Sequence, residues 1–283
     1  MLKGSSISII DRSSADLVAS DDSLDHLINE NYTAVIVRNA VPTEVLEKAS
    51  ERLTSESTQR LLSSPNKGMP GGELHTLGAA ATPTYTALSG PSTEVYTASA
   101  QQAHDWQSMI FDDYDMIHQV THLMSRLHHG YPAYPAPLKS NPTMTWLPFN
   151  YRVLSDQVQI YAHHDRHYRL PIYEELAENY SRETLFSWFI TVQKPSLGGQ
   201  LTIYGLQSDD PDPPMLPTRF VDTDALEREY YKQTLDLEQG DLVIFNSGQY
   251  VHRVTPVQGE KSRITIGGFL TFDFQRNHTI FWS

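Results

Sequence analysis

Short β-prone runs separated by turn residues dominate the chain from Thr143 onward, and they limit the folds that it can adopt. Each run is rich in β-branched and aromatic residues and is bounded by residues typical of turns. The runs are TMTWLPFNYRVL, QVQIYAH, LFSWFITVQ, QLTIYGL, DLVIFN, YVHRVTPV and RITIGGFLTF. Many short strands of this kind predict a sandwich or a barrel. Two insertions, YEELAENY (Tyr173 to Tyr180) and DALEREYYKQ, are expected to be helical.

The N-terminal half has a different sequence pattern, in which apolar residues recur with the 3.6-residue period of a helix in place of short strands. The expected elements are a strand over 33–41, a helix from Pro42 to about Leu53, loops and short strands over 55–91, and one or two helices over 94–129. We therefore predict one domain over residues 1–283 that is mainly β with flanking α-helices. Residues 1–142 would form its helical and loop part, and residues 143–283 its β core.

Composition excludes several functional classes. The 283 residues include no cysteine, which rules out zinc–thiolate sites, disulfides and cysteine nucleophiles, so a metal would have to bind His, Asp or Glu. The formal net charge is −13 and no run of Lys or Arg occurs, which argues against nucleic acid and membrane partners. A small-molecule substrate and a cytoplasmic location are expected, and the oligomeric state stays open.

The run QVQIYAHHD and the later run YVHRVTPV supply a candidate metal site. Alternate side chains of a strand point to one face, so His163 and Asp165 would lie together while His164 points away. His252 offers a third donor. Two imidazoles and one carboxylate on one face of an octahedron leave three positions open, as an Fe(II) oxygenase requires for an oxoacid and O₂. We predict that His163, Asp165 and His252 are the catalytic Fe(II) ligands.

Other histidines compete for this interpretation. A set of His163, Asp165 and His167 would also share one strand face, but it requires an unbroken strand and leaves Arg263 unexplained. The pairs His118/His122 and His128/His129 lie in the expected helical region without an acidic partner at metalloprotease spacing, so a solvated helix face explains them.

Arg263 follows His252 after a turn at 258–260. We expect the two strands joined by this turn to pair and to bring Arg263 close to the metal. A guanidinium binds a carboxylate through two parallel hydrogen bonds, so Arg263 is the predicted partner of an oxoacid carboxylate, with Thr265 adding a hydroxyl donor. Gln159 and Tyr161 share the face of His163, and they either border the cosubstrate or face the core.

A family resemblance follows from these segments. The run GDLVIFNSGQYVHRVTPVQGEKSRITIGGFLTFDFQRNHTIFWS resembles the carrier-independent Fe/2-oxoglutarate alkaloid halogenases of the welwitindolinone and ambiguine pathways. VQKPSLGGQLTIYGL and YRVLSDQVQIYAHHD look like segments of that family too. The resemblance covers residues 151–283 well and the N-terminal half in general layout. It implies a double-stranded β-helix (a cupin-like jelly roll) with iron at its mouth, and a role in natural-product biosynthesis.

The chain departs from the resembling family at one position. Those halogenases carry glycine where this chain has Asp165, and the missing carboxylate leaves room for chloride on the iron. We therefore expect a hydroxylase-type dioxygenase that converts 2-oxoglutarate to succinate. It would hydroxylate, desaturate, epoxidise or cyclise a free-standing small molecule, with contacts from the N-terminal helices and from residues 166–173. The alternative is a cupin-like metal-binding protein or a metal-dependent isomerase, in which Arg263 would have no role beside the metal.

Overall fold

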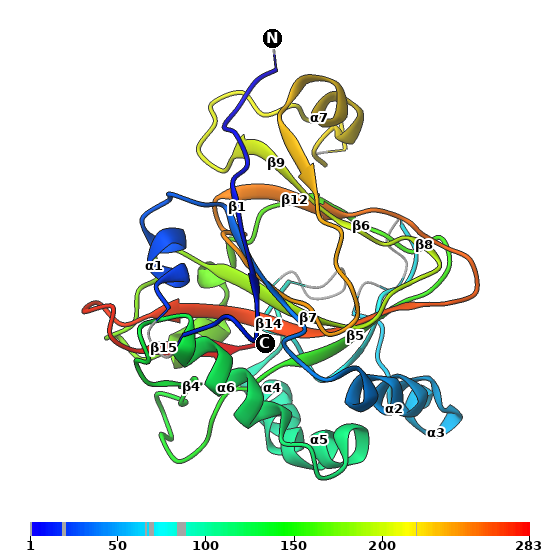
Figure 1. Cartoon of the computed structure of the whole chain (residues 1–283), viewed down its shortest axis with the longest axis vertical. Coiled ribbons are helices and arrows are strands. Elements are labelled where there is room, and N and C mark those ends of the chain that lie inside the picture. The colour runs from blue at the N-terminus through cyan, green and yellow to red at the C-terminus, as the bar shows by residue number, and fades with distance from the viewer. Residues whose placement is uncertain (1, 19–20, 66, 68–70, 84–88, 219) are drawn as a thin grey trace.

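The computed structural model describes the chain except residues 1, 19–20, 66, 68–70, 84–88 and 219. Its described strands form a nine-stranded sheet, a four-stranded sheet and a two-stranded ribbon. The two larger sheets face each other, and helices lie along the outer side of the nine-stranded sheet (Figure 1). This architecture confirms the predicted mainly β fold of the jelly-roll type with flanking helices.

The order of strands shows how distant segments meet. The large sheet contains β1 (Ile9–Ser13), β2 (Ala34–Arg38), β11 (Leu242–Phe245), β7 (Phe186–Gln193), β14 (Arg263–Phe272), β15 (Thr279–Trp282) and β4 (Ala133–Pro135) in that order, with β5 (Asn150–Leu154) paired to β14 and β3 (His75–Leu77) paired to β5. The small sheet contains β10 (Lys232–Thr234), β9 (Leu201–Gln207), β12 (Tyr250–Val254) and β6 (Ile160–His163), and the ribbon pairs β8 (Leu197–Gly198) with β13 (Val257–Gln258).

The helices differ in part from the expectation. They are α1 (Ser23–Ile28), α2 (Thr43–Thr54), α3 (Glu56–Gln59), α4 (Thr93–Gln101), α5 (Ala103–Phe111), α6 (Met116–Arg126) and α7 (Thr223–Glu229), with 3₁₀ turns η1 (His167–Arg169) and η2 (Pro171–Glu175). Residues 94–129 thus hold three helices. α5 ends before Asp112, which has a positive φ of 60°, and the Asp115 side chain caps α6. The expected helix at 173–180 is wrong, since η2 ends at Glu175. None of the helices in the described part of the chain is long and apolar enough to cross a membrane.

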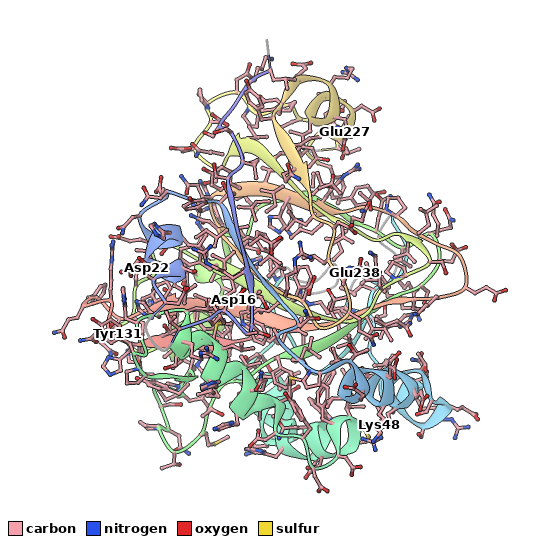
Figure 2. All side chains as sticks on the ribbon, viewed as in Figure 1. Asp16, Asp22, Lys48, Tyr131, Glu227 and Glu238 are labelled. Atoms are coloured by element: carbon pink, nitrogen blue, oxygen red, sulfur yellow. The ribbon has the colours of Figure 1, made fainter. Side chains whose placement is uncertain are left out.

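Burial on both faces explains the apolar character of the large sheet. All ten residues of β14 are buried. On one face, Ile190 and Ile266 pack with Leu46 and Leu123 of the covering helices. On the other face, Phe189 packs with side chains of the small sheet such as Ile203. Side chains from both sheets extend into the space between them, whereas charged side chains such as Asp22 and Lys48 lie at the outer surface (Figure 2).

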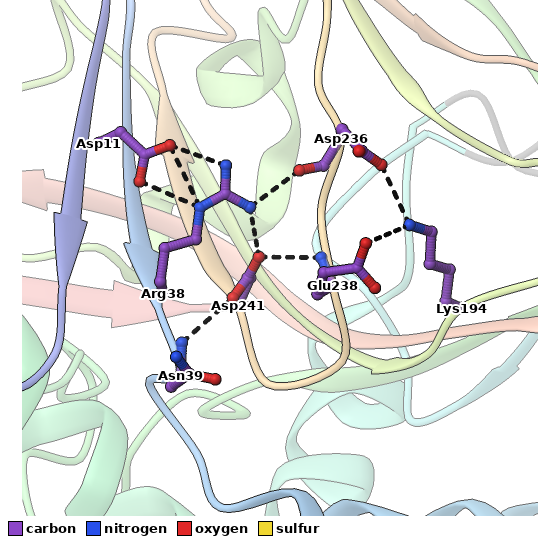
Figure 3. Close-up of polar contacts among 7 residues, drawn as sticks. All are labelled: Asp11, Arg38, Asn39, Lys194, Asp236, Glu238 and Asp241. Carbon is purple, nitrogen blue, oxygen red and sulfur yellow. Dashed lines mark hydrogen bonds and ion pairs between the residues drawn. The ribbon is translucent and has the colours of Figure 1, made fainter.

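A buried aspartate ties the N-terminal strands to the core (Figure 3). The carboxylate of Asp241 accepts hydrogen bonds from Arg38 Nη1 at 2.6 Å, from the backbone N–H of Asn39 at 3.1 Å and from that of Glu238 at 2.8 Å. Arg38 also binds Asp11 on β1, so one guanidinium joins three segments that are far apart in sequence. Burial of the carboxylate makes its hydrogen bonds obligatory.

We expect Asp241→Asn to lower the free energy of unfolding by about 2–4 kcal/mol. The change removes the negative charge that pairs with Arg38, and it replaces one acceptor oxygen by an NH₂ group that can only donate. Urea denaturation measures the change. Lys194→Met is the matched control, since Lys194 pairs with Asp236 and Glu238 in the same region but is 39% exposed. Its expected loss is about 1 kcal/mol or less. Equal losses for the two variants would contradict this account.

Candidate metal centre and cosubstrate cavity

Two neighbouring strands of the small sheet carry the predicted histidines. β6 pairs antiparallel with β12, and His163 lies directly opposite His252 in this register. Their rings are 4.4 Å apart. Directly paired residues of adjacent strands share a face, so the register alone brings the two imidazoles together.

Asp165 reaches the same point by a different route. It lies two residues beyond the end of β6, where its backbone N–H donates to the carbonyl of Ser247 at 2.8 Å. The expected strand alternation therefore ends at His163, and a loop contact sets the position of the carboxylate.

The three side chains form a compact donor set. Asp165 Oδ1 lies 3.6 Å from His163 Nε2, and Asp165 Oδ2 lies 3.8 Å from His252 Nε2. Among the residues that the structure describes, this is the group of three that could hold a metal, with its donor atoms within 4.8 Å of one another. The side chains of Asp165 and His252 are each 7% exposed, whereas that of His163 is 40% exposed, so the cluster is accessible on the His163 side. Two imidazoles and a carboxylate fit Fe(II).

Hydrogen bonds to backbone carbonyls orient both imidazoles. His163 Nδ1 donates to the carbonyl of Tyr161 at 2.7 Å, and His252 Nδ1 donates to that of Tyr250 at 3.1 Å. The free Nε2 atoms then face the cluster, which is the usual arrangement of a metal-binding histidine. Burial lowers the pKa of His252 to about 3, and the electrostatic effect of the neighbouring His163 contributes to this shift. The ring is therefore neutral at physiological pH, as metal binding requires.

The Asp165 carboxylate is held by two further side chains. Oδ1 accepts from His167 Nε2 at 2.9 Å, and Oδ2 accepts from Ser187 Oγ at 2.7 Å. Burial by itself raises the pKa of Asp165, but interactions led by the hydrogen bond from His167 outweigh it and hold that pKa well below its usual value. The carboxylate is thus ionised and oriented before any metal binds.

His167 does not join the cluster as a third donor. It lies in η1, beyond the end of β6, and its Nε2 points to the Asp165 oxygen. The ring packs against Phe269 at 5.3 Å. This geometry disfavours the set of His163, Asp165 and His167, because the strand that it needs is broken. His128 also differs from its expectation: it is fully buried, with Nδ1 2.9 Å from Thr279 Oγ1, and is not on a solvated helix face.

A cavity of about 160 Å³ between the two sheets joins the cluster to Arg263 and Thr265. Both residues are buried, and the Arg263 guanidinium lies 4.9 Å from the ring centre of Phe189. The hairpin expected between His252 and Arg263 is wrong, because β12 belongs to the small sheet and β14 to the large one. The two residues therefore face each other across the sandwich, which leaves room for a ligand between them.

Gln159 and Tyr161 do not line this cavity, whereas Ile160 does. The pairing of β6 with β12 shifts register between Val254↔Ile160 and His252↔His163, so three residues of β6 span the length of two on β12. Such a bulge interrupts alternation, and the expected common face with His163 is lost. The ring of Tyr161 packs instead against Phe220 at 5.6 Å.

Several residues that line the cavity were not among the predicted site residues. Asn150, Arg152 and Ser187 line the cavity beside the predicted ligands. An arginine within the apolar run NYRVL was a usable signal, because a charged residue amid buried strand positions needs a partner. The N-terminal wall comes from a loop and β3, not from the helices, through Pro65, Leu74, Thr76, Ala80 and Thr82. Residues Arg166, Tyr168 and Arg169 line a separate hollow of about 590 Å³, which Asp165 also borders.

Solved structures with this fold support the architecture. The chain is similar to an N-substituted L-amino acid dioxygenase from Burkholderia ambifaria, with 16% identity, a TM-score of 0.55, and coverage of 92% of this chain and 90% of that one. The structure of that dioxygenase in complex with alpha-KG gives 15% identity and a TM-score of 0.53 over the same shares of the chains. At such identity the likeness shows the fold alone. No curated protein matches the sequence.

Two histidines and a carboxylate around one point, with open positions beside them, are the donor set typical of non-haem Fe(II) oxygenases. The sequence model of the family described as "Carrier-protein-independent halogenase WelO5" matches residues 8–283. The chain belongs to this family, and the match includes the N-terminal half, where the resemblance was one of layout.

We expect His163→Ala and His252→Ala each to abolish stoichiometric Fe(II) binding, because two remaining donors cannot hold an open octahedral site. His167→Ala should bind Fe(II) within roughly tenfold to a hundredfold of the wild-type affinity, as it removes a group that orients Asp165. Anaerobic metal titration measures all three. Loss of binding in His167→Ala with retention in His252→Ala would establish the rival ligand set.

Proposed function

We propose that the protein is an Fe(II)- and 2-oxoglutarate-dependent dioxygenase of the hydroxylase type. The observation that carries the proposal is the buried guanidinium of Arg263, which faces the metal-binding cluster across one cavity. Among the described residues, no carboxylate lies within ion-pair distance of it. A buried cation without a partner is unfavourable unless a ligand supplies the anion.

In this proposal, His163, Asp165 and His252 hold Fe(II), and Arg263 binds the carboxylate of 2-oxoglutarate that is farthest from the metal. Thr265 lines the same cavity and supplies a hydroxyl donor. When bound, Fe(II) and 2-oxoglutarate supply the oxidising chemistry, with conversion of 2-oxoglutarate and O₂ to succinate, CO₂ and an oxidised substrate. The apolar walls exclude water from this reaction.

Asp165 decides the reaction type in this proposal. Ser187 and His167 each hold one of its oxygens, so the carboxylate is fixed where it would occupy a metal position. A halide would have to displace an ionised, hydrogen-bonded ligand. This argues for hydroxylation, desaturation, epoxidation or cyclisation, although the family is described as a halogenase family.

The substrate is proposed to be a free-standing small molecule that approaches from the exposed side of His163. Leu74, Thr76 and Thr82 border the cavity. A metal-binding protein or isomerase without oxygenase activity is the competing function, and it gives Arg263 no role. The cytoplasmic location stays a prediction.

Adding 2-oxoglutarate to the anaerobic Fe(II) protein should produce the weak visible charge-transfer band of the chelate, and turnover should release succinate. Arg263→Lys keeps the charge but loses the planar pair of donors, so we expect the affinity for 2-oxoglutarate to fall about tenfold or more while Fe(II) affinity changes little. Absence of the band in the wild type would refute the proposed function. Equal loss of both affinities would make Arg263 structural.

Chloride is the probe for Asp165. With Fe(II) and 2-oxoglutarate bound, chloride should leave the visible spectrum of the wild type unchanged, because the carboxylate fills the position. Asp165→Gly should bind Fe(II) more weakly and show a chloride-dependent spectral shift, with nitrate at equal ionic strength as the control. The variant should chlorinate weakly or not at all, since a halide also needs surrounding donors. A chlorine isotope pattern in a wild-type product would contradict this account.

A further inference from the structure

A second arginine lines the cavity that joins the metal-binding cluster to Arg263. Arg152 lies on β5, and its guanidinium Nε donates to Asn150 Oδ1 at 3.1 Å. Within the described part of the chain, no carboxylate is within ion-pair distance of it. The cavity wall therefore carries two guanidinium groups that form no salt bridge within the described part of the chain, although the Asp165 carboxylate of the same cavity acts on Arg152 through its charge.

Asn150 has a free donor beside this arginine. Its side chain is fully buried, Oδ1 is occupied by Arg152, and Nδ2 has no hydrogen-bond partner. A buried N–H without an acceptor costs about 1–3 kcal/mol, so such atoms usually indicate a missing ligand or water. Arg152 and Asn150 both line the cavity, and together they offer several N–H donors to one acceptor group.

Strand register places this pair between Arg263 and the cluster. On β14, Thr265 lies opposite Arg152 and Gly267 lies opposite Asn150. Toward one end of β14, Arg263 lies two residues from Thr265. Toward the other end, Phe269 lies two residues from Gly267 and pairs with Ser187, whose hydroxyl binds Asp165. Each such step is about 7 Å along the strand. A molecule that reaches from the cluster to Arg263 must pass the Arg152–Asn150 pair.

The electrostatics favour an anion at this point. Burial lowers the pKa of Arg152, with the charge of Asp165 partly opposing this shift, and burial together with the charge of Arg152 lowers the pKa of Arg263. Both shifts mean that the protonated guanidinium groups are poorly solvated and repel each other. A dicarboxylate that binds along the cavity would compensate both charges.

We propose that Arg152 and Asn150 form a second carboxylate-binding site, which holds the carboxylate next to the keto group of 2-oxoglutarate. The inference rests on the proposed function, in which Arg263 binds the opposite carboxylate. The site serves the cosubstrate and not the substrate, because it lies on the Arg263 side of the cluster. Donation from Arg152 and Asn150 Nδ2 to the carboxylate oxygen left free by the metal would orient the oxoacid for chelation.

An oxoacid that lacks the far carboxylate distinguishes the contributions of the two ends of the cosubstrate to binding. 2-Oxopentanoate keeps the five-carbon chain and the α-oxo acid but has a methyl group in place of the far carboxylate. Anaerobic titration of the Fe(II) protein, followed by the visible charge-transfer band, gives the affinity for each oxoacid without turnover. We expect Arg152→Met to lower the affinities for 2-oxoglutarate and 2-oxopentanoate by the same factor, about tenfold or more. Arg263→Met should lower the affinity for 2-oxoglutarate and leave the affinity for 2-oxopentanoate nearly unchanged.

Asn150→Ala provides a second, milder variant in case Arg152→Met folds poorly. It should lower the affinities for both oxoacids by the same, smaller factor. Arg253→Met is the matched control, because Arg253 lies on β12 but pairs with Glu227 at 2.7 Å outside the cavity. It should change neither affinity. Circular dichroism and Fe(II) titration verify folding and the metal centre of each variant.

Two results would overturn the inference. Unchanged affinity for both oxoacids in Arg152→Met would assign Arg152 to the substrate or to the scaffold. A loss seen with 2-oxoglutarate but absent with 2-oxopentanoate would assign it to the far carboxylate. Failure of the proposed function looks different, since the wild type would then show no band with either oxoacid.

Discussion

The antiparallel pairing of β6 with β12 is the constraint on which the rest of the site depends. It sets His163 opposite His252 in the small sheet, and the backbone carbonyls of these same strands fix both rings. Everything else is placed relative to this pair. Asp165 enters from the loop after β6, and the arginines approach from the opposite sheet.

Charge balance inside the sandwich explains why the cavity is built for an anion. One ionised carboxylate, Asp165, faces two guanidinium groups in a space that excludes most water. Adding a divalent metal leaves an excess of positive charge, which a dianionic oxoacid reduces. Desolvation makes each unpaired charge costly, so a bound dianion would compensate the positive charge of the cavity. This is the physical link between the fold and a dicarboxylate cosubstrate.

The family is described as one of halogenases, whereas the candidate donor set of this chain includes the carboxylate of Asp165. Family membership follows from a match over residues 8–283, whereas reaction type depends on what occupies one coordination position. His167 and Ser187 bind the two oxygens of Asp165, which means that the carboxylate is part of a hydrogen-bonded unit. Replacing Asp165 by glycine would leave His167 Nε2 without this acceptor, whereas Ser187 Oγ would keep Ser247 Oγ at 2.8 Å.

The sequence by itself determined the β-rich core, its covering helices and the identities of His163, Asp165, His252 and Arg263 as candidates, because donor type and spacing are local properties. The tertiary structure decided how they meet. A bulge in β6 turns Gln159 and Tyr161 away from the cavity, a loop contact positions Asp165, and β14 lies in the sheet opposite His252, in place of the expected hairpin. The roles of Asn150 and Arg152 emerge from the pairing of β5 with β14, two strands more than a hundred residues apart in the chain. Strand register and sheet assignment depend on long-range packing, which a local pattern does not encode.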